Sequence, residues 1–287
     1  MYKREMLEYY LDNIIKMAKK ETIDLFLYLQ EKGIDIKCIL DKANKLNYYV
    51  TDDEYFIFNT RSGVKAYYHM ESGGVFVPLV DAKYITDFVI IIQKDLKDDP
   101  SYILHELLHF VSTKDVTCVR GIPSGICVFA EEKDADARMR NMSINEGITD
   151  YFAYTICADL YDNSYRYFLE KGYMLHRYYY SVLLINLLVL ESKEKKNRLL
   201  KAYVNNDERY VFKEIKRCFN LSKNEARYLF DLGESVILDE NIDERNEFEK
   251  IVKTLIKFYY YNVFSKEDKD FESRNFELFK KDKIQQI

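Results

Sequence analysis

The stretch His105 to His109, which reads HELLH, constrains the fold of this chain more than any other feature. Two histidines four positions apart lie one turn above the other on the same face of an α-helix, so both imidazoles can reach one metal ion. The flanking sequence predicts that helix, because Asp98 or Asp99 can cap it and Pro100 suits its first turn. With four histidines in 287 residues, the pattern should arise by accident in roughly 0.4% of such chains. The alternative is a helix with two ordinary histidines.

A second acidic motif, Asn145 to Asp150 or NEGITD, opens the next helical segment. Glu146 and Asp150 are four positions apart and share a helix face. Catalytic zinc usually takes three protein ligands, so Glu146 is predicted to complete a set with His105 and His109. Asp150 can then accept the free N–H of a ligand imidazole and fix its tautomer. The alternative is a pair of solvated acids at the start of a helix. Against it, Ile144, Ile148 and Phe152 make that helix amphipathic, so the acids need a reason to share one side.

Short β-rich runs interrupt a helical pattern in the first third of the chain. Residues 1 to about 48 have helical spacing. Four β-rich runs follow, over residues 55–58, 64–70, 75–80 and 88–92. The segments Arg61–Gly63 and Glu71–Gly74 separate the first three runs, as hairpin turns do. Pro78 has no backbone N–H, so its strand is expected at a sheet edge.

Glycine (9) and proline (3) are scarce, and from Ile144 onward the pattern is helical almost throughout. We therefore expect an α+β fold with a small N-terminal mixed or antiparallel sheet and a mostly helical C-terminal lobe. One catalytic unit with two lobes is predicted. Its parts are N-terminal helices and sheet (1–100), the metal-site helices with a connecting excursion (101–160), and a helical C-terminal lobe (161–287).

Charge and cysteine content limit the partners and the compartment. The formal net charge of −5 argues against nucleic acid as the main partner. Five scattered cysteines without a CxxC pair are typical of reduced thiols, although a Cys118–Cys127 pair is an alternative. The N-terminus lacks the apolar core of a signal peptide, and the apolar stretch Val182–Leu190 is too short to span a membrane. We expect a core helix there and a cytoplasmic location.

Taken together, HELLH and NEGITD resemble the motifs of the gluzincins, the thermolysin-like zinc metallopeptidases, whose second helix carries N-E-x-x-[ST]-D. The likeness covers residues from about 88 to 155 and is nearest to bacterial gluzincin-like proteins with a Ser-Gly hairpin, as at Ser124-Gly125. It implies a zincin-like catalytic core. It implies Zn²⁺ ligation by His105, His109 and Glu146, with Glu106 as general base and Asp150 orienting a histidine. Glu146 follows His109 by 37 positions, which departs from the thermolysin spacing.

The resemblance also implies a reaction, the hydrolysis of peptide bonds in a peptide or protein substrate. Gluzincins often supply a Tyr or His from a later helix to stabilise the oxyanion. Tyr165 is the first choice here and His176 the second, against packing roles for both. Strands before the zinc helix commonly pair with the substrate backbone, and residues 75–80 are the candidate edge.

Two other functions remain open. A zinc-dependent amidase or other hydrolase would use the same motif, because HELLH determines how water is activated and not which bond is cleaved. A catalytically silent binding or regulatory protein would keep the fold without the reaction. The tyrosine-rich segment after residue 160 is either core packing of the second lobe or the lining of a groove.

Overall fold

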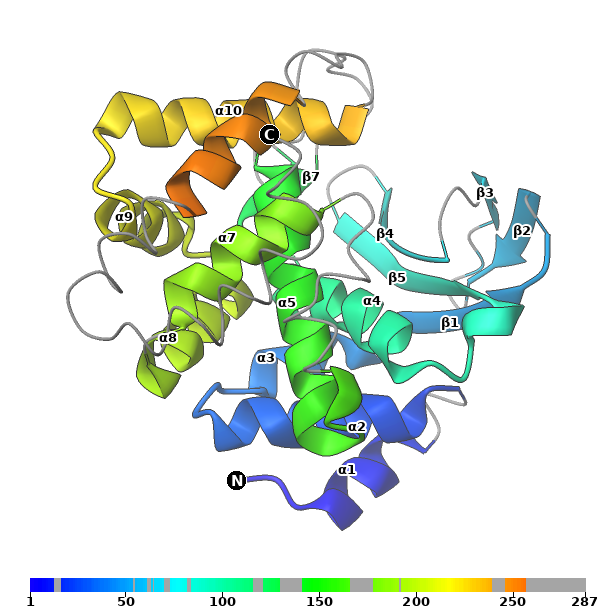
Figure 1. The fold of residues 1–287 in the computed structure, drawn as a ribbon. Helices are drawn as coiled ribbons and strands as arrows, with labels where there is room; N and C mark the ends of the chain where they lie inside the picture. The colour runs from blue at the N-terminus through cyan, green and yellow to red at the C-terminus, as the bar shows by residue number, and fades with distance from the viewer. Residues whose placement is uncertain are drawn as a thin grey trace. The chain divides into compact units, whose positions relative to one another are not determined.

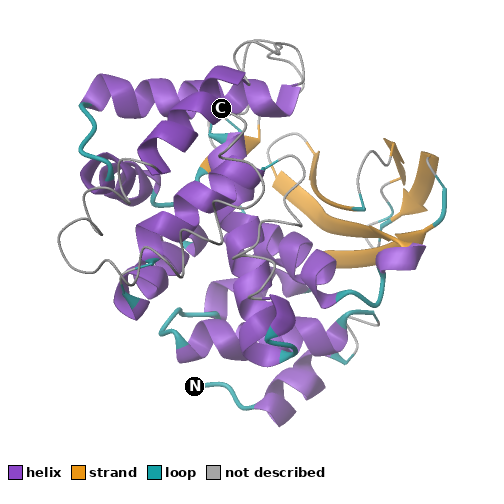
Figure 2. Cartoon of the chain, viewed as in Figure 1, coloured by secondary structure: helices purple, strands orange, loops and turns teal. Residues whose placement is uncertain are grey.

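The computed structural model describes residues 1–12, 17–53, 55–60, 63, 65–69, 73–81, 84–115, 121–129, 141–165, 178–190, 192–238 and 246–256. It is a mixed α+β structure with small sheets, as the sequence predicts (Figure 2). The chain forms two compact units. The first comprises Met1–Arg138, Asp159–Tyr161 and Val204–Asn206, and the second Met139–Ala158, Asp162–Tyr203 and Asp207–Ile287. The predicted division at residues 100 and 160 stays a prediction.

A mixed three-stranded sheet and a hairpin form the β-structure of the first unit's N-terminal part (Figure 1). The sheet contains β1 (Leu46–Thr51), β5 (Tyr84–Gln93) and β4 (Gly74–Asp81), in that order. In it β1 runs parallel to the central strand β5, and β4 runs antiparallel. The hairpin pairs β2 (Tyr55–Asn59) with β3 (Lys65–His69). Pro78 lies in β4 at one end of the strand order, which confirms the predicted edge position.

Strand β1 corrects the sequence analysis, which placed residues up to about 48 in helices. The helical part ends at Ala43 with α3, and Leu46 already pairs with Phe88. Residues 46–51 are rich in tyrosine and valine, which favour strands. The partner of β1 lies far along the chain, so no local spacing shows the pairing.

The two faces of the sheet have different neighbours because side chains alternate along a strand. On one face Val89 and Ile91 form a buried cluster with Phe58 of the hairpin. The other face carries Gly74 and Phe76 of β4 together with Ile90, the residue opposite Phe76 on β5. Helix α4 packs against β4 and β5 on this face (Figure 1). The edge strand β4 therefore lies along α4.

Four α-helices, one 3-10 helix and a second hairpin complete the described first unit. They are α1 (Arg4–Leu11), α2 (Lys19–Glu31), α3 (Lys37–Ala43), the 3-10 helix η1 (Lys94–Leu96), α4 (Pro100–Ser112), β6 (Ile122–Ser124) and β7 (Cys127–Phe129). Leu104, Leu107 and Leu108 of α4 are fully buried, and α4 also contacts α2. The Ser124-Gly125 hairpin that the resemblance pointed to is β6–β7.

The start of α4 has the predicted cap. Asp99 accepts hydrogen bonds from the Ser101 backbone N–H at 2.8 Å and the Ser101 hydroxyl at 2.6 Å, and Pro100 occupies the first turn.

Replacing Asp99 by Ala should lower the free energy of unfolding by about 1 kcal/mol, because two donors lose their acceptor. Urea denaturation measures the loss. The exposed neighbour variant Asp98→Ala should change stability by less than about 0.5 kcal/mol, and equal losses in both variants would contradict the capping role.

The second unit is helical throughout its described residues (Figure 2). Its helices are α5 (Met142–Leu160), α7 (Tyr179–Val189), α8 (Lys193–Val204), α9 (Glu208–Cys218), α10 (Lys223–Leu238) and a helix over residues 246–256. The apolar stretch 182–189 lies in α7 and is largely buried, as expected of a core helix. Among the residues that the structure describes, no helix combines the length and apolar composition needed to cross a membrane.

Helix α5 is buried around most of its circumference, and the amphipathic pattern expected there is wrong. Buried side chains run almost without interruption from Ser143 to Cys157. At Gly147 the helix approaches α7 so closely that a Cβ atom would lie 2.5 Å from the Ser181 Cβ. One helical turn earlier, the hydroxyls of Ser143 and Ser181 are 2.8 Å apart. The glycine of NEGITD is therefore explained by helix packing.

Candidate metal centre

Helix α4 brings the two histidines of HELLH together. The Nε2 atoms of His105 and His109 lie 3.1 Å apart, and the two rings meet edge-on with 4.8 Å between centroids. His109 is buried, whereas His105 is partly exposed. Both Nε2 atoms thus point to one place at the protein surface, where one ion could take both imidazoles.

Strand β4 supports this pair from the sheet. The Phe76 ring stacks on the His109 ring, with 6.3 Å between centroids and 16° between planes. Phe76 in turn stacks on Phe88 of β5 at 6.0 Å. The His109 imidazole is therefore held against aromatic side chains of the sheet, which limits its rotation.

Glu106 lies beside Gly74, the first residue of β4. Its side chain is buried, with 5% of its surface exposed. A Cβ atom on residue 74 would lie 2.9 Å from the Glu106 Oε1 and 3.2 Å from its Cγ. The carboxylate thus occupies space that only glycine leaves open, at the beginning of the edge strand.

The polar residues of NEGITD on α5 differ in burial and in their hydrogen bonds. Asn145, Glu146 and Thr149 are buried, and Asp150 is partly exposed. The Thr149 hydroxyl lies 2.9 Å from the Asn145 carbonyl, to which it donates, and 2.7 Å from the Tyr203 hydroxyl. Glu146 is buried and is therefore not a solvated acid, whereas for the partly exposed Asp150 the alternative interpretation stays open.

The candidate ligand atoms of His105, His109 and Glu146 all lie within 4.8 Å of one another. Within the described part of the chain, they are the one group of three or more such side chains. Two imidazole nitrogens and one carboxylate oxygen are donors suited to zinc.

Known proteins give no further guide to this site. Comparison with protein-family models, curated proteins and solved structures finds no match. The assignment of a function therefore depends on the residues themselves.

The other predicted site residues have different outcomes. Tyr165 is partly buried, and its ring lies 6.0 Å from that of Tyr154 on α5. Its role at an oxyanion stays a prediction. His176 lies outside the described residues, as does Cys118. Cys127 is a buried thiol that donates to the Ser124 carbonyl.

Sequence reasoning missed three residues around HELLH. Gly74 was interpreted as part of a turn, and Phe76 as an ordinary strand residue. Tyr48 was placed in a helix, but it lies on β1, with a buried hydroxyl that has no hydrogen-bond partner among the described residues. Burial and the carboxylates of Glu21 and Glu106 raise the pKa of Tyr48, so its hydroxyl stays protonated. The spacing of apolar residues along the sequence does not show which residues become neighbours in the folded chain.

Proposed function

We propose that this chain is a zinc-dependent peptidase with a zincin-like core. The main support for this proposal is the group of His105, His109 and Glu146, whose candidate ligand atoms lie within 4.8 Å of one another. Two imidazoles and one carboxylate leave a fourth position open on tetrahedral zinc, as catalytic sites require. Zinc at this position would polarise the scissile carbonyl and make an attacking water more acidic.

Glu106 is the general base in this proposal. It follows His105 directly in α4, and its carboxylate is confined beside Gly74. It takes the proton of the attacking water and then delivers it to the leaving amine.

Asp150 and Tyr165 have supporting roles. Asp150 accepts the second N–H of a ligand imidazole, which fixes the tautomer that presents Nε2 to the ion. Tyr165 donates to the oxyanion, as the resemblance implies. His176 is the alternative donor.

The edge strand β4 supports a peptide substrate over other substrates of zinc hydrolases. It stands at the end of the strand order β1-β5-β4 and begins beside Glu106. An extended peptide that adds to this edge would place its backbone next to the general base. An amidase for small substrates would gain nothing from such an edge.

Elemental analysis of the purified protein tests the proposal first. We expect about one zinc per chain, lost on chelation and restored by added Zn²⁺. His109→Ala and Glu146→Ala should each reduce the bound zinc to less than about a tenth, because two protein ligands hold zinc poorly. His69→Ala, on strand β3, is the matched control and should keep the metal. If the wild-type protein neither carries zinc nor gains thermal stability on its addition, the proposal is wrong.

A further inference from the structure

The last turn of α4 begins at His109, and its backbone carbonyls have an unusually complete set of donors. The His109 carbonyl accepts from the Thr113 hydroxyl at 2.7 Å and from the Thr113 N–H at 3.0 Å. The Ser112 carbonyl accepts from the Asn206 amide at 2.7 Å. The last carbonyls of a helix have no partner within the helix, so these donors come from elsewhere in the chain.

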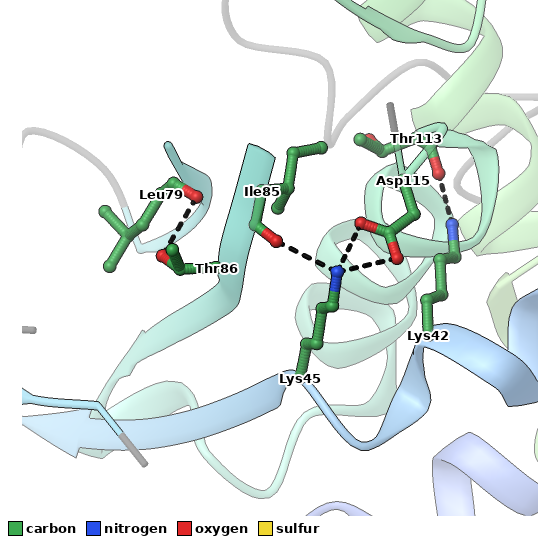
Figure 3. A network of polar contacts seen from close by, with 7 residues as sticks. All are labelled: Lys42, Lys45, Leu79, Ile85, Thr86, Thr113 and Asp115. Carbon is green, nitrogen blue, oxygen red and sulfur yellow. Dashed lines mark hydrogen bonds and ion pairs between the residues drawn. The ribbon is translucent and has the colours of Figure 1, made fainter. Parts of the chain in front are cut away.

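One side chain, Lys42 of α3, donates to three further carbonyls, of which that of Phe110 also accepts from the Thr113 N–H at 3.2 Å. Its Nζ donates to the carbonyls of Phe110 at 2.6 Å and Val111 at 3.3 Å, and to the carbonyl of Thr113. Figure 3 shows Lys42 reaching Thr113 beside the separate pair of Lys45 with Asp115. An ammonium group has three N–H donors, so the three carbonyls match it completely.

The surroundings of Lys42 show that this contact is built into the core. The residue is 4% exposed, and its Nζ lies 4.7 Å from the centre of the Phe110 ring and 5.5 Å from that of Phe88. A buried cation at a helix C-terminus interacts favourably with the negative end of the helix dipole. Burial lowers the pKa of Lys42 to about 7, while the Asp115 carboxylate opposes that shift. The ammonium therefore predominates below neutral pH.

We propose that Lys42 is a positioning residue for the metal centre, which holds the last turn of α4 so that His109 presents its Nε2 beside that of His105. This inference rests on the proposed function, because it concerns the same ligands. Without Lys42, three carbonyls directly after His109 lose a donor inside the core. The last turn then opens more often, and His109 spends part of its time away from the ion position.

Zinc affinity of the full chain tests the role. Lys42→Met keeps the length and the apolar stem of the side chain but removes all three donors. We expect its Kd for Zn²⁺, measured by competition with a fluorescent chelator at pH 6.5, to rise about 10-fold or more, the range found for residues that support metal ligands. Hydrogen exchange of the zinc-free protein should show faster exchange of the Thr113 amide, which donates to the His109 carbonyl.

Lys45→Met is the matched control. Lys45 lies one turn further along the chain, and its Nζ contacts Asp115 at 2.7 Å and the Ile85 carbonyl at 2.9 Å. Its loss should change the zinc Kd by less than about threefold. Urea denaturation and circular dichroism establish that both variants are folded.

The outcomes separate this inference from the proposed function. No zinc binding by the wild-type protein overturns the proposed function. Zinc binding by the wild type together with an unchanged Kd in folded Lys42→Met overturns the Lys42 inference alone, even if stability falls. If Lys42→Met does not fold, Lys42→Gln replaces it, since its amide keeps two donors on a shorter side chain, and faster exchange of the Thr113 amide there together with an unchanged Kd overturns the inference.

Discussion

Replacing Glu106 by Gln is expected to lower the rate of peptide hydrolysis by about 10³-fold while about one zinc per chain stays bound. Glutamine has nearly the same shape as glutamate, so it fits the space beside Gly74 without disturbing the two histidines. It cannot accept the proton of the attacking water, and the base contribution is lost. Turnover of a pool of quenched fluorescent peptides, measured with zinc analysis of the same samples, gives both quantities.

The comparison variant for Glu106→Gln is Glu31→Gln. Glu31 ends α2 and is exposed, so the same change of charge there should leave turnover within about twofold. Undiminished turnover in Glu106→Gln would remove Glu106 as the base. A wild-type protein that binds zinc and peptides but cleaves none of them would favour the silent binding protein.

Gly74→Ala should lower turnover by about 10²-fold with zinc still bound, the scale expected when a reacting group moves by about 1 Å. The added Cβ would lie 2.9 Å from both the Glu106 Oε1 and the Ile92 Cδ1, and 3.2 Å from the Glu106 Cγ. The backbone at this residue has no left-handed φ that would strain alanine. The Glu106 carboxylate therefore has to move away from its place beside His105 and His109.

Gly73→Ala is a demanding control for this prediction. A Cβ there would lie 2.4 Å from the Leu96 Cδ1 and 2.8 Å from the Tyr102 Cε1, so it crowds the same turn without touching Glu106. We expect a comparable loss of stability in urea and a much smaller loss of turnover. Equal losses of turnover in both variants would show that crowding of the turn, and not displacement of Glu106, is responsible.

Features that depend on local chemistry could be predicted from the sequence. The cap at Asp99 and the pairing of His105 with His109 follow from residues within a few positions of one another, and the structure has both. The edge position of β4 followed from a single residue, because Pro78 cannot donate to a neighbouring strand.

Features that depend on distant partners could not be predicted in the same way. The first residues of strand β1 were assigned to a helix because their partners, Phe88 and the residues after it, lie far along the chain. Gly74 and Lys42 carry no local signal, since their importance comes from Glu106 and from the carbonyls of α4. Glu146 was predicted as the third ligand from its motif and from the three protein ligands that catalytic zinc usually takes, and its role stays a prediction.

The central position of β5 in the sheet has a consequence for how the chain folds during synthesis. Both β1 and β4 pair with β5, which is the last of the three strands to be made. Residues 46–51 leave the ribosome well before residues 88–93, their partners in the parallel pair. The sheet therefore cannot grow strand by strand from the N-terminus, and its formation has to wait for β5. Ribosome-bound chains whose residue 93 is still inside the exit tunnel should expose strand β1 to chaperones, and chains whose residue 93 has left the tunnel should shield it.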